Sequence, residues 1–246
     1  MPPFTVSSLQ KSIIEKGTGS FDSSGWSLLS EEISFPAAVI NQEALMNNAK
    51  WMQTFSERAN VKFAPHGKTT MSPELFNIQL QQGCWGMSLA TVPQVVTAYR
   101  SGIKRIILAN QLIGLRHFEI IAELLAEGDL ELYCFVDSIE NAKSLGQYFS
   151  DKNVKLNILL EIGVIGGRCG WRDTDSIMQL CDVIAQFKCL QICGVSFYEG
   201  VIHGENATND IISFVKSITK LSQSLFDHGV FLIPFYVHVP MHDYGR

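Results

Sequence analysis

The feature that most constrains the fold is a regular alternation of short apolar strands with helical segments. Strand starts recur roughly every 20–35 residues, which is the rhythm of repeated β–α–β units. The strands are near-continuous runs of isoleucine, valine and leucine, so both of their faces are expected to be buried, as in parallel sheets covered by helices. The predicted strands are 37–40, 61–64, 85–90, 105–109, 130–136, 156–162 and 190–197.

The helices between these strands have start and stop signals. Asn41 is a candidate N-cap for the first helix. The sequence Ser72-Pro73-Glu74 offers an N-cap, a proline in the first helical position and an acidic first turn, and Gly83 ends that helix. The other helices are predicted from 93 onward and over 115–126, 139–149, 175–187 and 210–226.

Two architectures accommodate this pattern: an open doubly wound sheet and a (β/α)8 TIM-type barrel. The number of consecutive units favours the barrel. The glycine-rich loop 163–170 follows a strand, but it does not fit the G-x-G-x-x-G fingerprint of dinucleotide-binding folds. Residues 1–30 are polar and rich in serine and glycine, so they are predicted to form an N-terminal arm outside the barrel.

Charge and apolar content exclude several classes of partner. The 246 residues carry a formal net charge of −5, so they offer no electrostatic footprint for nucleic acid. The N-terminus lacks the apolar core of a signal peptide, and no apolar stretch approaches the ~20 residues that span a bilayer. The six cysteines mostly lie in apolar runs, which is typical of buried thiols in a reducing compartment. We therefore expect a soluble, cytoplasmic protein without nucleic-acid or membrane partners.

Lys68 is the main candidate for a reactive residue. It follows the strand predicted at 61–64 and precedes a helix, so it lies where α/β folds place their active sites. A lysine that is desolvated there, or near a cation such as His66, can lose its proton and attack a carbonyl. The string around it is not a phosphate-binding Walker A loop, because Lys62 stands where the first glycine should be and Pro65 interrupts the loop. A solvated lysine at a loop edge is the plain alternative.

Three further residues are candidates on weaker grounds. Arg168, in the glycine-rich loop, could offer its fork of donors to a planar ligand, or it could be a surface arginine in a tight turn. Tyr198 could contact a ring or cap the barrel core, and His203 reads as an ordinary loop histidine. No metal site is predicted, because a proline interrupts the i, i+4 pair His238 and His242.

A family resemblance adds to this interpretation. The segment 65–74, Pro-His-Gly-Lys-Thr-Thr-Met-Ser-Pro-Glu, closely resembles the cofactor-lysine motif of D-threonine aldolase and D-serine dehydratase-like proteins, also called amino acid deaminases. These are pyridoxal-phosphate enzymes of fold type III, with the alanine racemase N-terminal-type barrel. Similar landmarks follow in order at 83–91, 107–111, 161–163, 167–170 and 198–200, and the resemblance covers roughly residues 30–228.

The resemblance implies a pyridoxal-phosphate-binding barrel domain over 31–229. Lys68 would form the Schiff base with pyridoxal 5'-phosphate, Arg168 and Tyr198 would lie near the cofactor ring, and His66 would support the lysine loop. The implied activity is that of a lyase acting on D-amino acids with a β-hydroxyl group, such as D-serine or D-threonine. It would proceed either by dehydration and deamination or by aldol cleavage. A homodimer is compatible with the resemblance.

The sequence departs from the family pattern after residue 229. Relatives continue with a Gly-Gly-Ser phosphate-binding strand and a β domain that carries ligands for a divalent metal, whereas 230–246 lacks these features and is expected to be a divergent tail. The family places the strand near Ala38 in the second domain. That leaves six barrel strands, with 231–239 as a candidate seventh, and an incomplete barrel. The alternatives are a non-catalytic pyridoxal-phosphate-binding barrel and an inactive truncated form.

Overall fold

The computed structural model describes residues 27, 29–32, 35–36, 38–231 and 236–238. The chain divides into two compact units, Met1–Trp51 and Met52–Arg246. Helix α1 (Gln42–Arg58) begins in the first unit, and all the described strands lie in the second. The predicted N-terminal arm, 1–30, and the predicted divergent tail, 230–246, lie mostly outside the described residues.

The second unit is built on one sheet of six parallel strands. In chain order they are β1 (Met87–Leu89), β2 (Arg105–Gln111), β3 (Glu131–Val136), β4 (Leu156–Ile162), β5 (Leu190–Phe197) and β6 (Tyr236–His238). Each strand pairs with the next one along the chain, in the order β1 to β6. A doubly wound sheet would reverse this order at a switch point, whereas barrels keep it. The topology is that of part of a β/α barrel, which confirms the predicted fold class.

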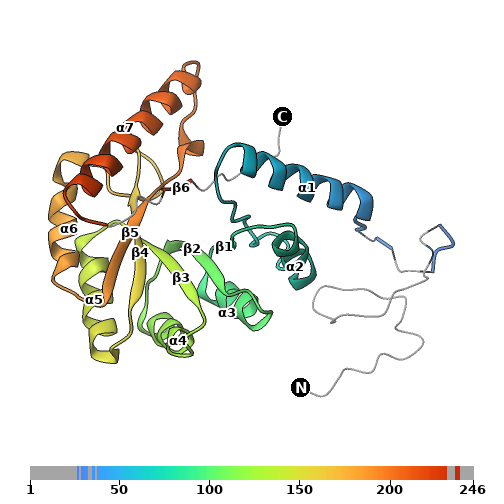
Figure 1. Cartoon of the computed structure of the whole chain (residues 1–246), viewed down its shortest axis with the longest axis horizontal. Helices are drawn as coiled ribbons and strands as arrows, with labels where there is room; N and C mark the ends of the chain where they lie inside the picture. Colours follow the sequence, from blue (N-terminus) through green and yellow to red (C-terminus); the bar gives the residue numbers. More distant parts are fainter. Residues whose placement is uncertain (1–26, 28, 33–34, 37, 232–235, 239–246) are drawn as a thin grey trace. The chain divides into compact units, whose positions relative to one another are not determined.

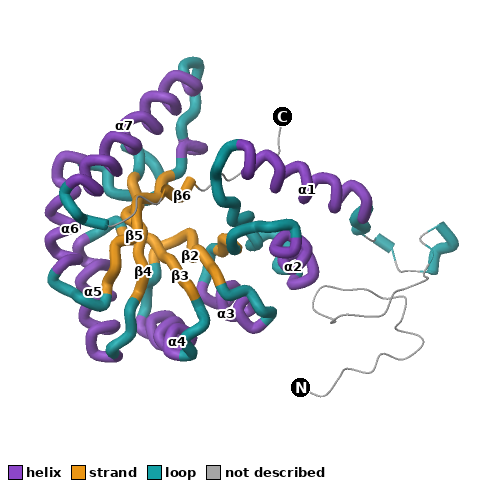
Figure 2. Tube along the Cα trace, in the orientation of Figure 1, coloured by secondary structure: helices purple, strands orange, loops and turns teal. Residues whose placement is uncertain are grey.

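Helices connect the strands on one side of the sheet. Helix α2 (Pro73–Gln81) precedes β1. The connections between consecutive strands contain α3 (Val92–Arg100), α4 (Leu115–Ala126), α5 (Ile139–Lys152), α6 (Ile177–Ala185) and α7 (Ala207–Asp227), with two short 3₁₀ turns, η1 (Thr174–Ser176) and η2 (Glu199–Val201). Figure 1 shows α3 to α7 ranged along the outer side of the fanned strands, and Figure 2 shows the strands gathered on the inner side. This is the layering expected of parallel strands buried by crossover helices.

The side chains of β2, β3 and β4 alternate between two apolar layers. Ile106 and Leu108 of β2 point outward into the main core, which they share with the helices. Ile107 points inward and joins a smaller cluster with Phe135 and Leu159 from the neighbouring strands. The period of two therefore divides the sheet into a helix-covered face and an inner face. The inner face carries the floor of the candidate site.

Two predicted strands are not regular strands in the structure. Residues 38–40 form no strand, and Ala37 lies outside the described residues. Segment 61–64 is extended but irregular: the carbonyl of Phe63 accepts from the Trp85 amide at 2.8 Å, and His66 makes one isolated parallel bridge to Ser88. Pro65 has no N–H to donate, so a continuous ladder with β1 cannot form along this segment. The candidate strand at 231–239 is represented by β6, which pairs with β5.

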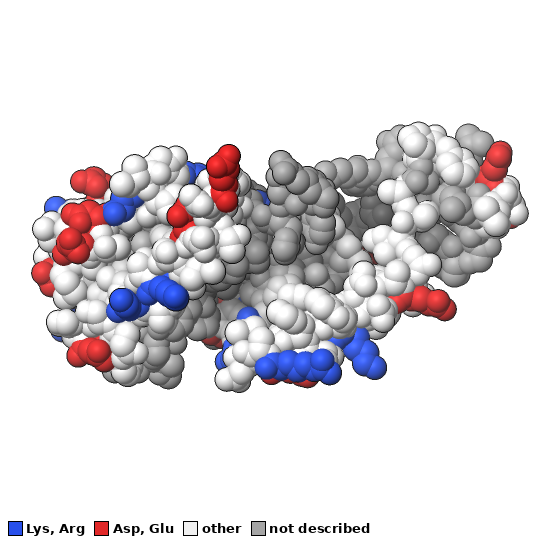
Figure 3. All heavy atoms as spheres, turned by 90° about the horizontal axis from the view of Figure 1, so that it is seen from above, with Lys and Arg blue, Asp and Glu red and all other residues white. Residues whose placement is uncertain are grey.

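Figure 3 shows charged side chains of both signs spread over the described residues on the face drawn. None of the helices that the structure describes is long and apolar enough to cross a membrane.

Gly146 of α5 offers a test of this packing. A Cβ atom built there would lie 2.2 Å from Cγ of Phe187, so any side chain must displace that ring. Alanine is favoured over glycine by about 1 kcal/mol in helix interiors, whereas overpacking a core costs about 1–3 kcal/mol. We expect Gly146→Ala to lower the free energy of unfolding in urea by about 1–2 kcal/mol. Ser144→Ala, at an exposed position of the same helix, is the control and should be neutral. Stabilisation by Gly146→Ala would show that the contact is not tight.

Candidate active site

A pocket opens at the carboxyl end of the parallel strands. Among the residues that line it are His66, Lys68, Glu161, Arg168, Cys169 and Tyr198. The four residues singled out from the sequence as cofactor contacts thus come together here, from segments that precede β1 and follow β4 and β5. This edge is the one at which barrels build their sites.

The turn that carries Lys68 is fixed by the buried Ser88 of β1. The Ser88 amide donates to the Pro65 carbonyl at 2.9 Å, and the Gly67 amide donates back to the Ser88 carbonyl at 2.8 Å. A Cβ atom at Gly67 would lie 2.6 Å from Cε1 of Phe76, so only glycine lets the turn pack this closely on α2. The lysine therefore starts from a backbone that is held on one side by the sheet.

The helix start predicted after Lys68 holds the other side of the turn. Met71 donates its amide to the Gly67 carbonyl at 3.0 Å, which closes the turn. Ser72 is the N-cap of α2, and its Oγ accepts from the Leu75 amide at 3.4 Å. Pro73 occupies the first turn of the helix, as predicted. Lys68 thus projects from a short turn between two anchored elements.

His66 is a neutral imidazole at neutral pH. Burial lowers the pKa of His66 to about 4, and the positive charges of Lys68 and Arg168 act in the same direction. Its Nδ1 is buried and has no hydrogen-bond partner among the residues that the structure describes. His66 therefore supplies no positive charge to Lys68. Arg168 carries a positive charge in the same pocket.

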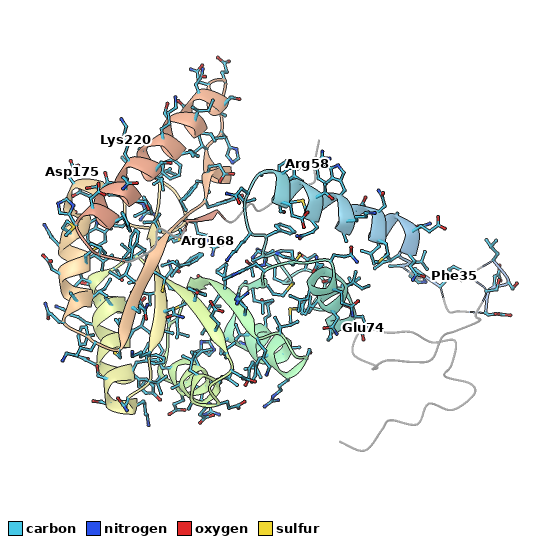
Figure 4. All side chains as sticks on the ribbon, viewed as in Figure 1. Phe35, Arg58, Glu74, Arg168, Asp175 and Lys220 are labelled. Atoms are coloured by element: carbon cyan, nitrogen blue, oxygen red, sulfur yellow. The ribbon has the colours of Figure 1, made fainter. Side chains whose placement is uncertain are left out.

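Arg168 lies in the glycine-rich loop 163–170, which Arg172 stabilises through hydrogen bonds. Arg172 directs its guanidinium at three loop carbonyls: Nε donates to Val164 at 3.3 Å, Nη1 to Gly170 at 2.9 Å and Nη2 to Gly167 at 2.7 Å. Arg168 itself makes no hydrogen bond or ion pair with any described residue. Figure 4 shows it on the inner side of the strands. A guanidinium with free donors at a pocket is suited to an acidic oxygen.

Asp137 fastens the base of this loop to the sheet. Its Oδ2 accepts from the Gly170 amide at 2.7 Å and from Nε2 of Gln111 at 2.8 Å. The Gly163 amide donates to the Trp171 carbonyl at 3.1 Å, which closes the loop on β4. Sequence reasoning missed Asp137 and Gln111, because a polar residue just after a strand is common in any βα loop. The loop is nevertheless anchored to the ends of three strands.

The other candidate residues divide between the pocket and its surroundings. Tyr198 lines the pocket, and its ring lies against Gly200, where a Cβ atom would be 2.2 Å from Oη. His203 is exposed and does not line the pocket. His238 lies in β6, and His242 lies outside the described residues. Within the described ranges, no group of three or more histidine, cysteine, aspartate or glutamate residues could hold a metal ion.

Glu161 is a functional candidate to which sequence reasoning gave no role, although it lies in the family landmark at 161–163. It is 4% exposed, and burial raises the pKa of Glu161 to about 7. The Ser196 hydroxyl and the positive charge of Arg168 oppose this rise, whereas the negative charge of Asp137 adds to it. Cys169 Sγ lies 3.9 Å from its Oε1, while Oε2 has no hydrogen-bond partner among the described residues. The available signal was a carboxyl inside an otherwise apolar strand. Burying a charged group costs free energy unless the group is paired, so such a residue is rarely placed there without a role.

The raised pKa predicts a specific dependence of stability on pH. The pKa of Glu161 rises from an ordinary 4.5 to about 7 on folding, so the unfolded chain ionises first as the pH increases. The native state should therefore lose up to about 3 kcal/mol between about pH 4 and pH 7 because of this group. We expect Glu161→Gln to remove this part of the loss, measured by urea unfolding across that range. The exposed Glu123→Gln is the control, and an unchanged pH slope in Glu161→Gln would contradict the prediction.

Comparisons with known proteins agree with this architecture. The family model for the alanine racemase N-terminal domain matches residues 40–231. A D-threonine aldolase of Arthrobacter sp is 24% identical over 192 residues, which are 78% of this chain and 50% of the relative. This chain spans about half the length of this relative and of two similar curated 3-hydroxy-D-aspartate aldolases.

Two solved structures share the fold. The D-threonine aldolase from Filomicrobium marinum has a TM-score of 0.73 and 22% identity, covering 80% of this chain and 54% of that one. The D-threo-3-hydroxyaspartate dehydratase from Delftia sp. HT23 has a TM-score of 0.71 and 19% identity, covering 82% of this chain and 54% of that one. The matched family model covers the sheet strands β1 to β5, their helices and the Lys68 turn. The chain belongs to the alanine racemase N-terminal domain family.

Proposed function

We propose that the pocket binds pyridoxal 5'-phosphate through Lys68, and that the protein is a lyase acting on D-amino acids with a β-hydroxyl group. The observation that carries the proposal is the meeting of Lys68, His66, Arg168 and Tyr198 along one pocket at the carboxyl edge of the sheet. Similar proteins named D-threonine aldolase and D-threo-3-hydroxyaspartate dehydratase support the reaction class. Both names describe chemistry at a D-amino acid with a hydroxyl group on Cβ.

The chemistry of the pocket fits this cofactor. A primary amine is the group that captures an aldehyde, and Lys68 supplies one from an anchored turn. Arg168 offers uncommitted donors to an acidic ring oxygen, and the neutral His66 and Tyr198 offer flat surfaces to an aromatic ring. Two buried polar atoms that line this pocket, His66 Nδ1 and Glu161 Oε2, have no partner in the described chain, which is typical of a site that is completed by a ligand.

The residues of the chain have distinct tasks in such a reaction. Bound pyridoxal phosphate withdraws electrons from Cα of an attached amino acid, which weakens the bonds at that atom. Lys68 would hold the cofactor and, as a free amine, would carry a proton at Cα of the substrate. Arg168 orients the ring, and the loop held by Arg172 and Asp137 keeps Arg168 in place. The apolar inner face beneath the pocket limits access of water.

Turnover assays test the proposal and separate the two lyase reactions. The full protein is incubated with pyridoxal phosphate and D-threonine, with L-threonine as the stereochemical control. Aldol cleavage releases glycine and acetaldehyde, whereas dehydration followed by hydrolysis releases 2-oxobutanoate and ammonia. Either product set, formed from the D-isomer alone, supports the proposal. A stable cofactor adduct on Lys68 without turnover would instead favour the non-catalytic binding protein, and neither adduct nor turnover would favour the inactive form.

A further inference from the structure

Glu161 lies on the inner face of the sheet, directly under the pocket. Along β4, Leu160 and Ile162 point outward into the main core, whereas Leu159 belongs to the inner cluster. The alternation of a strand therefore places Glu161 on the inner side, one step nearer the carboxyl edge than Leu159. Ser196 of β5 is the register partner of Glu161 and is fully buried. The two polar side chains form a small inward-facing patch on an otherwise apolar wall.

This patch has unused hydrogen-bonding capacity. Ser196 lies close enough to Glu161 for its hydroxyl to favour the ionised carboxylate, but Glu161 Oε2 and Ser196 Oγ are buried and neither makes a hydrogen bond of good geometry with a described residue. Arg168 is near enough for its charge to act on Glu161, but the two form no ion pair within the described chain. Native structures rarely leave such groups unpaired unless water or a ligand completes them. Because Glu161 also lines the pocket, a molecule bound there can reach this carboxyl.

We propose that Glu161 is a ligand-binding residue of this pocket: its carboxyl pairs with an N–H or O–H donor of the bound molecule and gives up a proton when that molecule binds. This inference rests on the proposed function, because pyridoxal phosphate is the ligand with which the role of Glu161 is tested. The expected ligand carries a hydrogen-bond donor close to an acidic oxygen. The donor would pair with the Glu161 carboxylate, and the acidic oxygen would accept from the Arg168 guanidinium.

The groups around Glu161 set the direction of the proton exchange. Asp137 faces it from the end of β3, and Arg168 and Cys169 face it from the glycine-rich loop. His66 lines the same pocket but is neutral in this pH range. Burial raises the pKa of Glu161 to about 7, so the carboxyl holds a proton in part of the molecules at neutral pH. A hydrogen-bond donor favours the ionised form, and binding therefore expels that proton.

The number of protons released on binding measures this directly. Calorimetric titrations of the full protein with pyridoxal phosphate are run in pairs of buffers with different ionisation heats, at about pH 6, 7 and 8. The cofactor and Lys68 exchange protons of their own, so the relevant quantity is wild type minus Glu161→Gln. We expect this difference to approach one released proton at about pH 6, where Glu161 is mostly protonated, and to vanish at about pH 8. The affinity of Glu161→Gln should also fall by about tenfold or more at pH 8.

Glu123→Gln, at an exposed position on α4, is the matched control and should release the same protons as wild type. Equal proton counts in wild type and Glu161→Gln at every pH, with binding intact, would overturn the proposal and leave the proposed function standing. Failure of wild type and Glu123→Gln alike to take up pyridoxal phosphate would overturn both. Binding with a pH-dependent difference supports both.

Discussion

Replacing Lys68 by alanine should abolish covalent capture of pyridoxal phosphate and lower lyase turnover by about 10³-fold or more. The loss is large because the same amine holds the aldehyde and carries a proton, and no other lysine was found among the residues lining the described pocket. Capture is measured by reducing the cofactor-treated protein with borohydride and mapping the modified peptide. In wild type the adduct should map to the segment that contains Lys68.

Two further variants make this result specific. Lys68→Arg keeps a positive charge but cannot bond the aldehyde carbon, so it should be as inactive as Lys68→Ala if covalent capture matters and partly active if charge alone matters. Lys62→Ala, at an exposed position in the preceding segment, should retain both the adduct and turnover. An adduct that maps to the same peptide in Lys68→Ala would refute the assignment. Urea unfolding should show that all three variants remain folded, since the Lys68 side chain is not part of the core.

The parts of the fold that the sequence predicted well are those fixed by local pattern. The strands 156–162 and 190–197 and the helix 115–126 occur at the predicted residues, because an apolar run bounded by turn residues determines both ends. The segment 61–64 behaved differently. Its apolar residues predicted a strand, but the hydrogen bonds that it makes depend on Pro65 and on the distant Ser88, which a local pattern cannot reveal.

The site shows the same division. Lys68 was found because a turn between a strand and a capped helix is visible in the sequence, and Arg168 because glycines surround it. Glu161 received no role because a single carboxyl within an apolar strand resembles an ordinary strand residue. Arg172 was overlooked because it acts by donating hydrogen bonds to three loop carbonyls. The positions of these carbonyls depend on the backbone path of the loop, which a sequence motif does not reveal. The residues that bind can be anticipated from motifs, whereas those that hold them in place emerge from the folded chain.

Gly170 shapes the loop that carries Arg168, and we expect its replacement by alanine to cause a large loss of stability. Gly170 has φ of +99°, and a Cβ atom there would lie 2.3 Å from the Gly163 nitrogen, which is backbone and cannot rotate away. Its amide also donates to Asp137, and its carbonyl accepts from Arg172. Gly170→Ala should therefore cost about 2–5 kcal/mol of stability, from a disfavoured φ and an overpacked loop base together.

Gly166→Ala separates the two causes. Gly166 lies in the same loop with φ of +78°, but a Cβ atom there would meet nothing within 4 Å. It should lose only the conformational part, about 1–2 kcal/mol, and keep its affinity for pyridoxal phosphate. Gly170→Ala should in addition weaken that affinity by about tenfold or more, because the loop that holds Arg168 loses its two anchors. Urea unfolding and a fluorescence titration with the cofactor measure the two effects. If both variants lost the same stability and neither lost affinity, the close contact between Gly163 and Gly170 would have no part in positioning Arg168.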